Sequence, residues 1–465
     1  MNIKMRIATI VCCLAISVAA VAKTPKYIFY FIGDGMGMSH VMTTEAYNRL
    51  VLGNHQHILM MQFPVATMAT SYSFNSPITD SAAAGTALAT GHKTNNDMIA
   101  MSPDTVAVSS IAQELKSLGY GIVIATSVPL DDATPAVFYA NQPSRRMFYE
   151  IDKQLPLSSY DMFVGGSLRG TKSKNGPTDA IERIQKAGYT IAYGADQYEK
   201  IKGKNKLVLL NNDSTSEQFG YTIDSIRQNL HLPYITKACI EHEMKFSPNK
   251  FFMMIEGGNI DWAAHANDAA AVVKEVLNFN EAIREAYNFY LKHPDETLIL
   301  VTADHCTGGL QMGNDYHQMY ANLKNFDYER ISLQAFGRLC EKWIKNGTMK
   351  DWEKMKIYLQ DNLGLYSHVK VSDAQDKEIQ EEFRKAFVLG NNVDKKTLYA
   401  TYSNFVAKVY NVFDDCNGIG WTTHSHAGDF TPVFAIGAGS EIFQGVNNNT
   451  DLPNKIRKLT GLKVQ

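Results

Sequence analysis

The 465-residue sequence has little cysteine, no excess of charge of one sign, and no long hydrophobic run after its first residues. The 45 lysines and arginines nearly balance the 47 acidic residues, and a net charge of −2 predicts neither a broad basic surface nor an acidic tail. No later stretch approaches the roughly 18 apolar residues of a membrane span. We therefore expect no specific nucleic-acid partner and no stable membrane span.

The chain also lacks internal repeats, low-complexity tracts and Pro/Ser-rich linkers. Its hydrophobic content of 45% is ordinary for a globular protein and excludes disorder. We therefore favour one large domain with insertions over two or three separate domains. The four cysteines after the first 22 residues are scattered, show no CxxC spacing and leave the pairing open: Cys239, Cys306, Cys340 and Cys416.

The first 22 residues have the pattern of a secretory signal peptide. Lys4 and Arg6 precede an apolar run over residues 7–21, and the segment ends in the Ala-Val-Ala tripeptide at positions 20–22. We expect cleavage near Ala22. The remaining residues, 23–465, would then form an exported protein, either periplasmic or secreted.

Short runs rich in β-branched and aromatic residues alternate with helical patterns. The predicted strands cover residues 27–32, 121–125, 251–255, 297–302 and 432–436, and helical patterns cover 109–118, 178–187 and 269–291. The strands are apolar at consecutive positions, which is typical of a sheet buried on both faces. The pattern predicts an α/β fold, a three-layer αβα sandwich with a central, mostly parallel sheet.

Two stretches interrupt this alternation. Residues 313–418 are rich in Lys, Glu, Tyr and Trp and show helical patterns at 331–343, 352–361 and 374–387. We interpret this stretch as a largely helical insertion, a cap over the sheet that precedes the last candidate metal-ligand segment. A smaller insertion is predicted over residues 149–247.

Polar side chains follow four of the predicted strands at the point where each strand ends. In an open parallel sheet, ligands bind outside the carboxyl ends of the strands. Carboxylates that converge there repel one another, and bound divalent cations relieve that repulsion. The candidate ligands at these ends are Asp34, Asp132, Thr134, Glu256, Asp304 and His305.

Two further segments add nitrogen ligands. Asp261 and His265 are four residues apart and share one face of a helical turn, and His424 and His426 precede the last strand. A mixed nitrogen and oxygen set suits zinc, and an all-oxygen set of Asp, Glu and Thr suits magnesium. Each motif alone is typical of a turn or a capped helix, but together they predict a site with several metals.

The segment that begins at Asp80 and Ser81 continues with an alanine-rich run. It reads either as a plain capped helix or as a helix N-terminus that presents the Ser81 hydroxyl to a phosphate. Beside a divalent cation, a serine hydroxyl can act as a nucleophile. Arg145 and Arg146 follow further on, and an arginine fork can hold two phosphate oxygens, although a solvated surface charge is the simpler explanation for any single arginine.

In order and spacing, these motifs together resemble the alkaline phosphatase family, over residues 27 to 437. The resemblance implies that Ser81 is a nucleophile that forms a phosphoserine and that Arg145 clamps the phosphate. It implies a two-zinc plus magnesium centre, in which the first zinc stabilises the leaving oxygen and the second activates Ser81. Its ligands would be Asp261, His265 and His426 for the first zinc, Asp34, Asp304 and His305 for the second, and Asp132, Thr134 and Glu256, bridged by Asp34, for the magnesium.

By this resemblance, the chain is expected to be a phosphomonoesterase, EC 3.1.3.1, that acts on small phosphate monoesters, and a homodimer is possible. Trp262 stands where some members carry a lysine that helps to hold phosphate, so we include it among the substrate-binding residues. His424 competes with His426 as a ligand, and the Ala-Gly that follows favours His426.

Three other functions share parts of this pattern. A phosphodiesterase or phosphonate hydrolase could use the same scaffold, but Arg145 favours a monoester, because a clamp on two phosphate oxygens leaves little room for a second ester group. A sulfatase is disfavoured, because Ser81 is not followed by the Pro and Arg of the sulfatase motif. An inactive exported binding protein would be expected to lose metal ligands, and none is missing.

Overall fold

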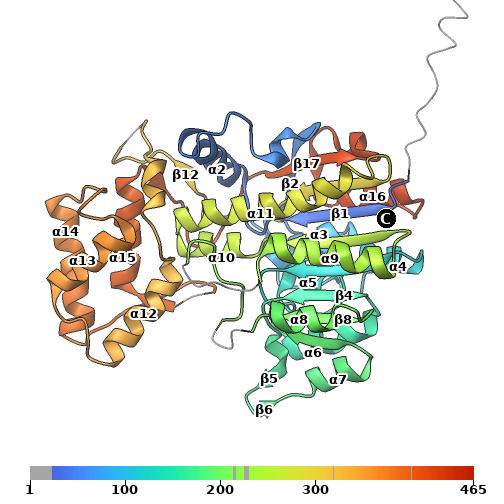
Figure 1. The fold of residues 1–465 in the computed structure, drawn as a ribbon, viewed down its shortest axis with the longest axis horizontal. Helices are drawn as coiled ribbons and strands as arrows, with labels where there is room; N and C mark the ends of the chain where they lie inside the picture. Colours follow the sequence, from blue (N-terminus) through green and yellow to red (C-terminus); the bar gives the residue numbers. More distant parts are fainter. Residues whose placement is uncertain (1–23, 213–215, 225–229, 318, 400) are drawn as a thin grey trace, which may run out of the picture.

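The computed structural model describes residues 24–212, 216–224, 230–317, 319–399 and 401–465 (Figure 1). The predicted signal peptide therefore lies outside the described residues. Among the helices that are described, none is both long enough and apolar enough to cross a membrane.

A central sheet of ten strands runs through the molecule. Seven of its nine neighbouring pairs are parallel, and β17 is antiparallel to both of its neighbours, β10 and β2. In spatial order the strands are β18 (Asn447–Asn448), β2 (Val65–Thr70), β17 (Thr431–Gly437), β10 (Thr297–Thr302), β1 (Tyr27–Ile32), β9 (Phe251–Glu256), β3 (Gly121–Thr126), β4 (Met162–Gly165), β8 (Leu207–Leu210) and β7 (Thr190–Tyr193).

Helices cover both faces of the sheet. On β1, Phe29 and Phe31 pack into one apolar cluster, and Ile28, Tyr30 and Ile32 pack into the other, because successive side chains of a strand point to opposite faces. The first cluster includes α2 (Met38–Leu50), α8 (Ala195–Ile201), α9 (Leu232–Phe246), α10 (Asn259–Ala266) and α11 (Ala269–Tyr290); the second includes α3 (Ser81–Thr90), α4 (Ile111–Ser117), α5 (Ala133–Ala136), α6 (Phe148–Gln154), α7 (Ala180–Lys186) and α16 (Asp451–Thr460). The predicted αβα sandwich with a mostly parallel sheet is confirmed.

The five strands expected from the sequence are β1, β3, β9, β10 and β17. The stretch 149–247, expected as a smaller insertion, supplies β4, β8 and β7, which extend the same central sheet. Each of these strands has only four residues, too few for a periodic pattern to distinguish them. The insertion bounds at 149–247 and 313–418 stay predictions.

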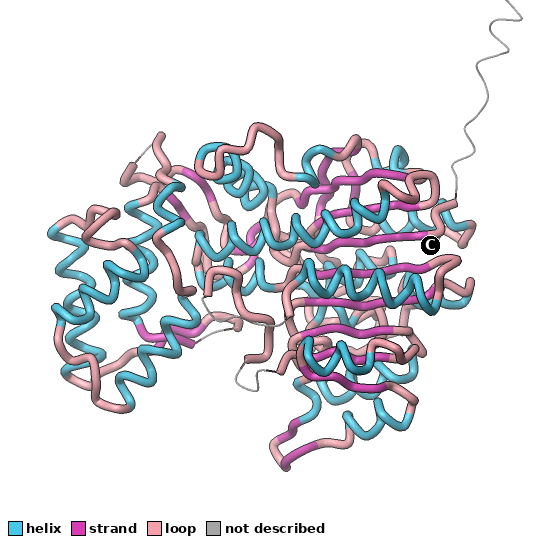
Figure 2. Tube along the Cα trace, in the orientation of Figure 1, coloured by secondary structure: helices cyan, strands magenta, loops and turns pink. Residues whose placement is uncertain are grey.

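A largely helical lobe stands at one end of the sheet and is drawn in orange in Figure 1. From here on the name cap refers to residues 331–416 of this lobe, which lie within the insertion predicted over 313–418. It contains α12 (Leu333–Lys345), α13 (Trp352–Leu363), α14 (Asp373–Phe383), which a π-helical turn continues (Arg384–Val388), and α15 (Asn404–Cys416). A hairpin of β13 (Asp394–Lys396) and β14 (Thr401–Ser403) joins α14 to α15 and is drawn in magenta on the cap in Figure 2. The turn of this hairpin carries Tyr399, which contacts Arg145.

The four cysteines left open by the sequence are all buried thiols. None of Cys239, Cys306, Cys340 and Cys416 forms a disulfide. Burial raises the pKa of Cys306 to about 12, so this thiol is kept in its neutral form beside the site.

Replacing Arg457 with methionine is expected to lower the free energy of unfolding by about 3 kcal/mol, because the change leaves a carboxylate without its partner. The Arg457 side chain is fully buried. It donates two hydrogen bonds to the Glu114 carboxylate and a third to the Thr90 carbonyl. Arg284→Met is the control, since that arginine forms an exposed pair with Glu281 and its loss should cost less than about 0.5 kcal/mol. Urea denaturation of the two variants measures the difference; equal midpoints would contradict it.

Candidate metal and phosphate site

The predicted ligands meet at one edge of the sheet, as their positions at strand ends require. β1 lies between β9 and β10, and all three run parallel, so the segments that follow them converge. Gly35 makes this approach possible. It has a φ of +69°, and a Cβ there would lie 2.9 Å from the Asp261 Oδ1 atom and 2.8 Å from Thr307 Oγ1. Any larger residue would push the ligand loops apart.

One group of candidate ligands, the set predicted for the second zinc, surrounds the Nε2 atom of His305. This atom lies 3.1 Å from Asp304 Oδ2, 3.4 Å from Asp34 Oδ1 and 3.1 Å from Ser81 Oγ. Four atoms bound tetrahedrally to zinc at about 2.0 Å lie about 3.3 Å from one another. The observed spacings match that value, and the Asp34 Oδ1 and Asp304 Oδ2 atoms are buried without a hydrogen-bond partner.

Another group, the set predicted for the first zinc, brings Asp261, His265 and His426 together. The Nε2 atoms of the two histidines face each other at 3.2 Å, and His265 Nε2 lies 3.4 Å from Asp261 Oδ2. Each ring is oriented by its other nitrogen, which lies 2.7 Å from a backbone carbonyl, that of His424 for His265 and that of Thr79 for His426. The protonated nitrogens therefore face the carbonyls, and two lone pairs face each other, an arrangement that a cation between them stabilises.

The imidazole of His424, the competing ligand, points elsewhere. Its Nε2 atom lies 2.5 Å from Lys395 Nζ of the cap hairpin, and its Nδ1 atom lies 3.2 Å from the backbone carbonyl of His265, so neither ring nitrogen faces the side-chain donors of the group. The geometry places the His426 ring, and not the His424 ring, among the candidate ligand side chains.

The third predicted group is oxygen-rich. The Thr134 hydroxyl and both carboxylate oxygens of Glu256 are buried without a hydrogen-bond partner. Asp132 differs, because its Oδ1 atom accepts from Arg145 at 2.9 Å and its Oδ2 atom from Arg169 at 3.2 Å. Both of its oxygens are thus already engaged by guanidinium groups.

The electrostatics reflect carboxylates held together out of water. Burial, and then repulsion from Asp304 and Asp261, raises the pKa of Asp34 well above its usual range, and burial raises the pKa of Glu256 to about 8. Burial and the neighbouring His305 and His265 lower the pKa of His426 well below its usual value. Imidazole nitrogens beside crowded carboxylates are a donor set that divalent cations bind.

Ser81 is the first residue of α3 and lies beside the group around His305 Nε2. The Asp80 carboxylate caps the helix by accepting from the Ala83 N–H at 2.9 Å, which leaves Ser81 at the positive end of the helix dipole. The small residues of α3 allow a close approach to α5, where a Cβ on Gly85 would lie 3.2 Å from Val137. The two interpretations of this segment, a helix with an N-cap at Asp80 and a helix end that presents Ser81 to a phosphate, are therefore compatible.

Arg145 lies beside this helix end. It donates to Asp80 Oδ2 at 3.3 Å, to Asp132 at 2.9 Å and to the Tyr399 hydroxyl at 2.9 Å. Trp262 does not reach Arg145. It is buried, and its ring stacks on that of Tyr399, with centroids 4.7 Å apart. Every predicted site residue is thus found in this one region.

Three residues of the region have no counterpart in the sequence prediction. Arg169 follows β4 and links Asp132 to Glu217, Thr307 donates to Asp261, and Tyr399 lies in the turn of the cap hairpin. Thr307 comes two residues after His305 and could have been suspected. Arg169 and Tyr399 stand outside any motif, and only the fold brings them here.

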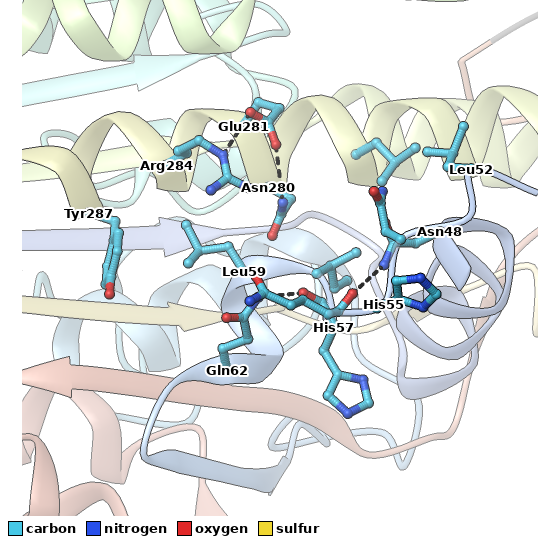
Figure 3. Close-up of a pocket in the computed structure, with 14 residues that line it drawn as sticks. Asn48, Leu52, His55, His57, Leu59, Gln62, Asn280, Glu281, Arg284 and Tyr287 are labelled. Atoms are coloured by element: carbon cyan, nitrogen blue, oxygen red, sulfur yellow. Dashed lines mark hydrogen bonds and ion pairs between the residues drawn. The ribbon is translucent and has the colours of Figure 1, made fainter. Parts of the chain in front are cut away.

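A pocket of about 720 Å³ lies elsewhere, between residues 54–62 and α11 (Figure 3). Several of its polar groups pair with one another. Arg284 pairs with Glu281 at 3.0 Å, and Asn48 donates to the Gln56 carbonyl at 3.0 Å. None of its lining side chains is a buried polar group without a partner among the described residues, so it offers no comparable chemistry.

Comparisons with known proteins agree with this geometry. The alkaline phosphatase family model matches residues 25–164 and 174–462. Two curated relatives from Bacillus subtilis, alkaline phosphatase 4 and alkaline phosphatase 3, are 29% and 30% identical, and each alignment covers 93% of this chain and 88% of the relative.

Solved structures show the same fold. The cold-active alkaline phosphatase of Shewanella sp. superposes with a TM-score of 0.78 at 24% identity, over 93% of this chain and 99% of that one. A variant of TAB5 alkaline phosphatase, solved with Mg bound in its M3 site, gives 0.67 at 25% identity, over 95% and 99% of the two chains. With the family model matched over residues 25–164 and 174–462 and the fold shared, the chain belongs to the alkaline phosphatase family, and family and fold together support a phosphatase.

Proposed function

We propose that the chain is an exported alkaline phosphatase. It would hydrolyse phosphate monoesters to an alcohol and inorganic phosphate through a phosphoserine at Ser81. The observation that carries the proposal is the set of spacings around His305 Nε2, where two carboxylate oxygens and the Ser81 hydroxyl lie 3.1 to 3.4 Å away. A nucleophile within a candidate metal group at a helix N-terminus is suited to phosphoryl transfer.

The donor sets fit two zinc ions and one magnesium. Asp34, Asp304 and His305 would hold one zinc, and Asp261, His265 and His426 the other. Asp132, Thr134 and Glu256 would hold the magnesium together with Asp34, and Arg145 and Arg169 contact the Asp132 carboxylate. When bound, these cations supply charge neutralisation for the phosphoryl oxygens and lower the pKa of a hydroxyl or a water.

The chain's own residues perform the remaining tasks. Ser81 Oγ forms a bond to phosphorus as the ester bond breaks and the alcohol leaves, and water then cleaves the phosphoserine. Asp80 fixes the start of α3, so the hydroxyl is held in place through both steps. Arg145 lies within reach of the same space and can pair with two phosphate oxygens.

The defining experiment compares a chromogenic phosphate monoester with the matching diester, using the mature chain at alkaline pH. Rapid monoester hydrolysis that chelation abolishes, and that zinc and magnesium restore, is the expected result. A preference for the diester would move the chain to the phosphodiesterase branch of the superfamily. Binding of metals without hydrolysis of either ester would favour a binding role.

Arg145→Ala is expected to raise the KM for a phosphate monoester about 100-fold with a smaller effect on kcat, because it removes two charge-assisted hydrogen bonds to the bound phosphate. Arg146→Ala is the matched control, since that neighbouring side chain is exposed and forms none of the described ion pairs. Steady-state kinetics on both variants test the assignment. An unchanged KM in the Arg145 variant would remove the clamp from the proposal.

A further inference from the structure

Tyr399 is the one cap residue that contacts both Arg145 and Trp262 among the described interactions of the site. It lies in the turn between β13 and β14, a hairpin that Figure 2 shows on the helical lobe, and its contacts with Arg145 and Trp262 place it at the site. Its ring stacks on Trp262 with an interplanar angle of 13° and meets the ring of His265 edge-on, with centroids 5.2 Å apart. Two aromatic contacts therefore fix the direction of its hydroxyl.

That hydroxyl has hydrogen-bonding capacity left over. Its oxygen accepts from Arg145 at 2.9 Å, and among the described residues no acceptor takes its own hydrogen. A phenol that accepts one bond can still donate one. Arg145 is in a similar position, because three of its five N–H groups are used by Asp80, Asp132 and Tyr399, and two remain.

Arg145 and Tyr399 border the same cavity. Tyr399 and Arg145 line a pocket of about 560 Å³ together with Asp132 and Arg169. An anion held there by Arg145 would lie next to the Tyr399 hydroxyl, since the two side chains are hydrogen-bonded. The indole of Trp262 carries no charge and stacks on the tyrosine ring.

We infer that Tyr399 is a phosphate-binding residue, supplied by the cap, which donates its hydroxyl hydrogen to an oxygen of the phosphate that Arg145 holds. The inference rests on the proposed function, because that function places the phosphate beside Arg145. It makes the cap hairpin a part of the site and assigns Trp262 the task of holding Tyr399 in position.

The test measures inorganic phosphate binding to the zinc- and magnesium-loaded protein by calorimetry, so that it does not depend on turnover. Tyr399→Phe keeps the ring and removes the hydroxyl, and we expect phosphate to bind about 10-fold more weakly, the effect of one hydrogen bond to a charged group. Metal content and melting temperature should stay as in the wild type. Tyr402→Phe is the matched control, because this tyrosine of the same hairpin is buried in the cap with its hydroxyl unpartnered.

The outcomes separate the inference from the proposed function. Weaker phosphate binding in Tyr399→Phe, with Tyr402→Phe unchanged, supports the role of Tyr399 whether or not a monoester is hydrolysed. Equal phosphate affinity in Tyr399→Phe and the wild type overturns it, even if the wild type is an active phosphatase. An equal loss in both tyrosine variants would also overturn it, since it would indicate a general effect on the hairpin.

Discussion

Ser81→Ala is expected to reduce the turnover of a phosphate monoester by about 10³-fold or more, while the metals stay bound. The hydroxyl is the only group of this side chain that can attack phosphorus, and its loss removes the covalent route entirely. Asp80 continues to cap α3 in the variant, because its bond to the Ala83 N–H does not involve the serine hydroxyl. The loss should therefore come without unfolding.

Two measurements make the Ser81 prediction specific. Metal analysis of the variant should match the wild type, since Ser81 is not needed to assemble the carboxylates and imidazoles. Mass spectrometry of acid-quenched wild type with substrate should find one phosphate on the peptide that carries Ser81. Ser110→Ala is the control. It removes the N-cap side chain of α4, a helix that carries none of the candidate site residues, and should leave kcat unchanged. Full activity in Ser81→Ala would exclude the serine as nucleophile.

The sequence predicts the location of the candidate ligands where they lie at the ends of buried strands. Asp34, Glu256 and Asp304 come within two residues of β1, β9 and β10, and the parallel register of these strands brings them to one edge. Here local pattern and global topology are linked, because the end of a strand is also the edge of the sheet. The prediction needed no knowledge of side-chain packing.

The same reasoning fails where the position of a residue depends on a long connection. Tyr399 is 254 positions from Arg145, in a two-stranded hairpin with no hydrophobic periodicity. Arg169 follows a four-residue strand that the sequence does not reveal. β2 was missed because it mixes buried and exposed positions without regular alternation. Tertiary packing, and not local propensity, places these residues.

Between the two histidines that the sequence left in competition, the structure allows a decisive comparison. His426→Ala is expected to lower the affinity for one zinc and the turnover of a monoester by at least about 100-fold, because it removes a nitrogen that faces His265 at 3.2 Å. His424→Ala keeps the backbone carbonyl that accepts from His265 and loses an imidazole that contacts Lys395 Nζ and the His265 backbone carbonyl.

The expected result is therefore loss of zinc in the first variant and near wild-type metal content and activity in the second. Metal analysis and kinetics at several zinc concentrations measure it, and excess zinc should partly restore His426→Ala, since the remaining ligands, Asp261 and His265, are still in place. Binding also stabilises the folded state in proportion to affinity, so zinc should raise the melting temperature of His424→Ala more than that of His426→Ala. The reverse order would identify His424 as the ligand and would require the loop before β17 to turn over when metal binds.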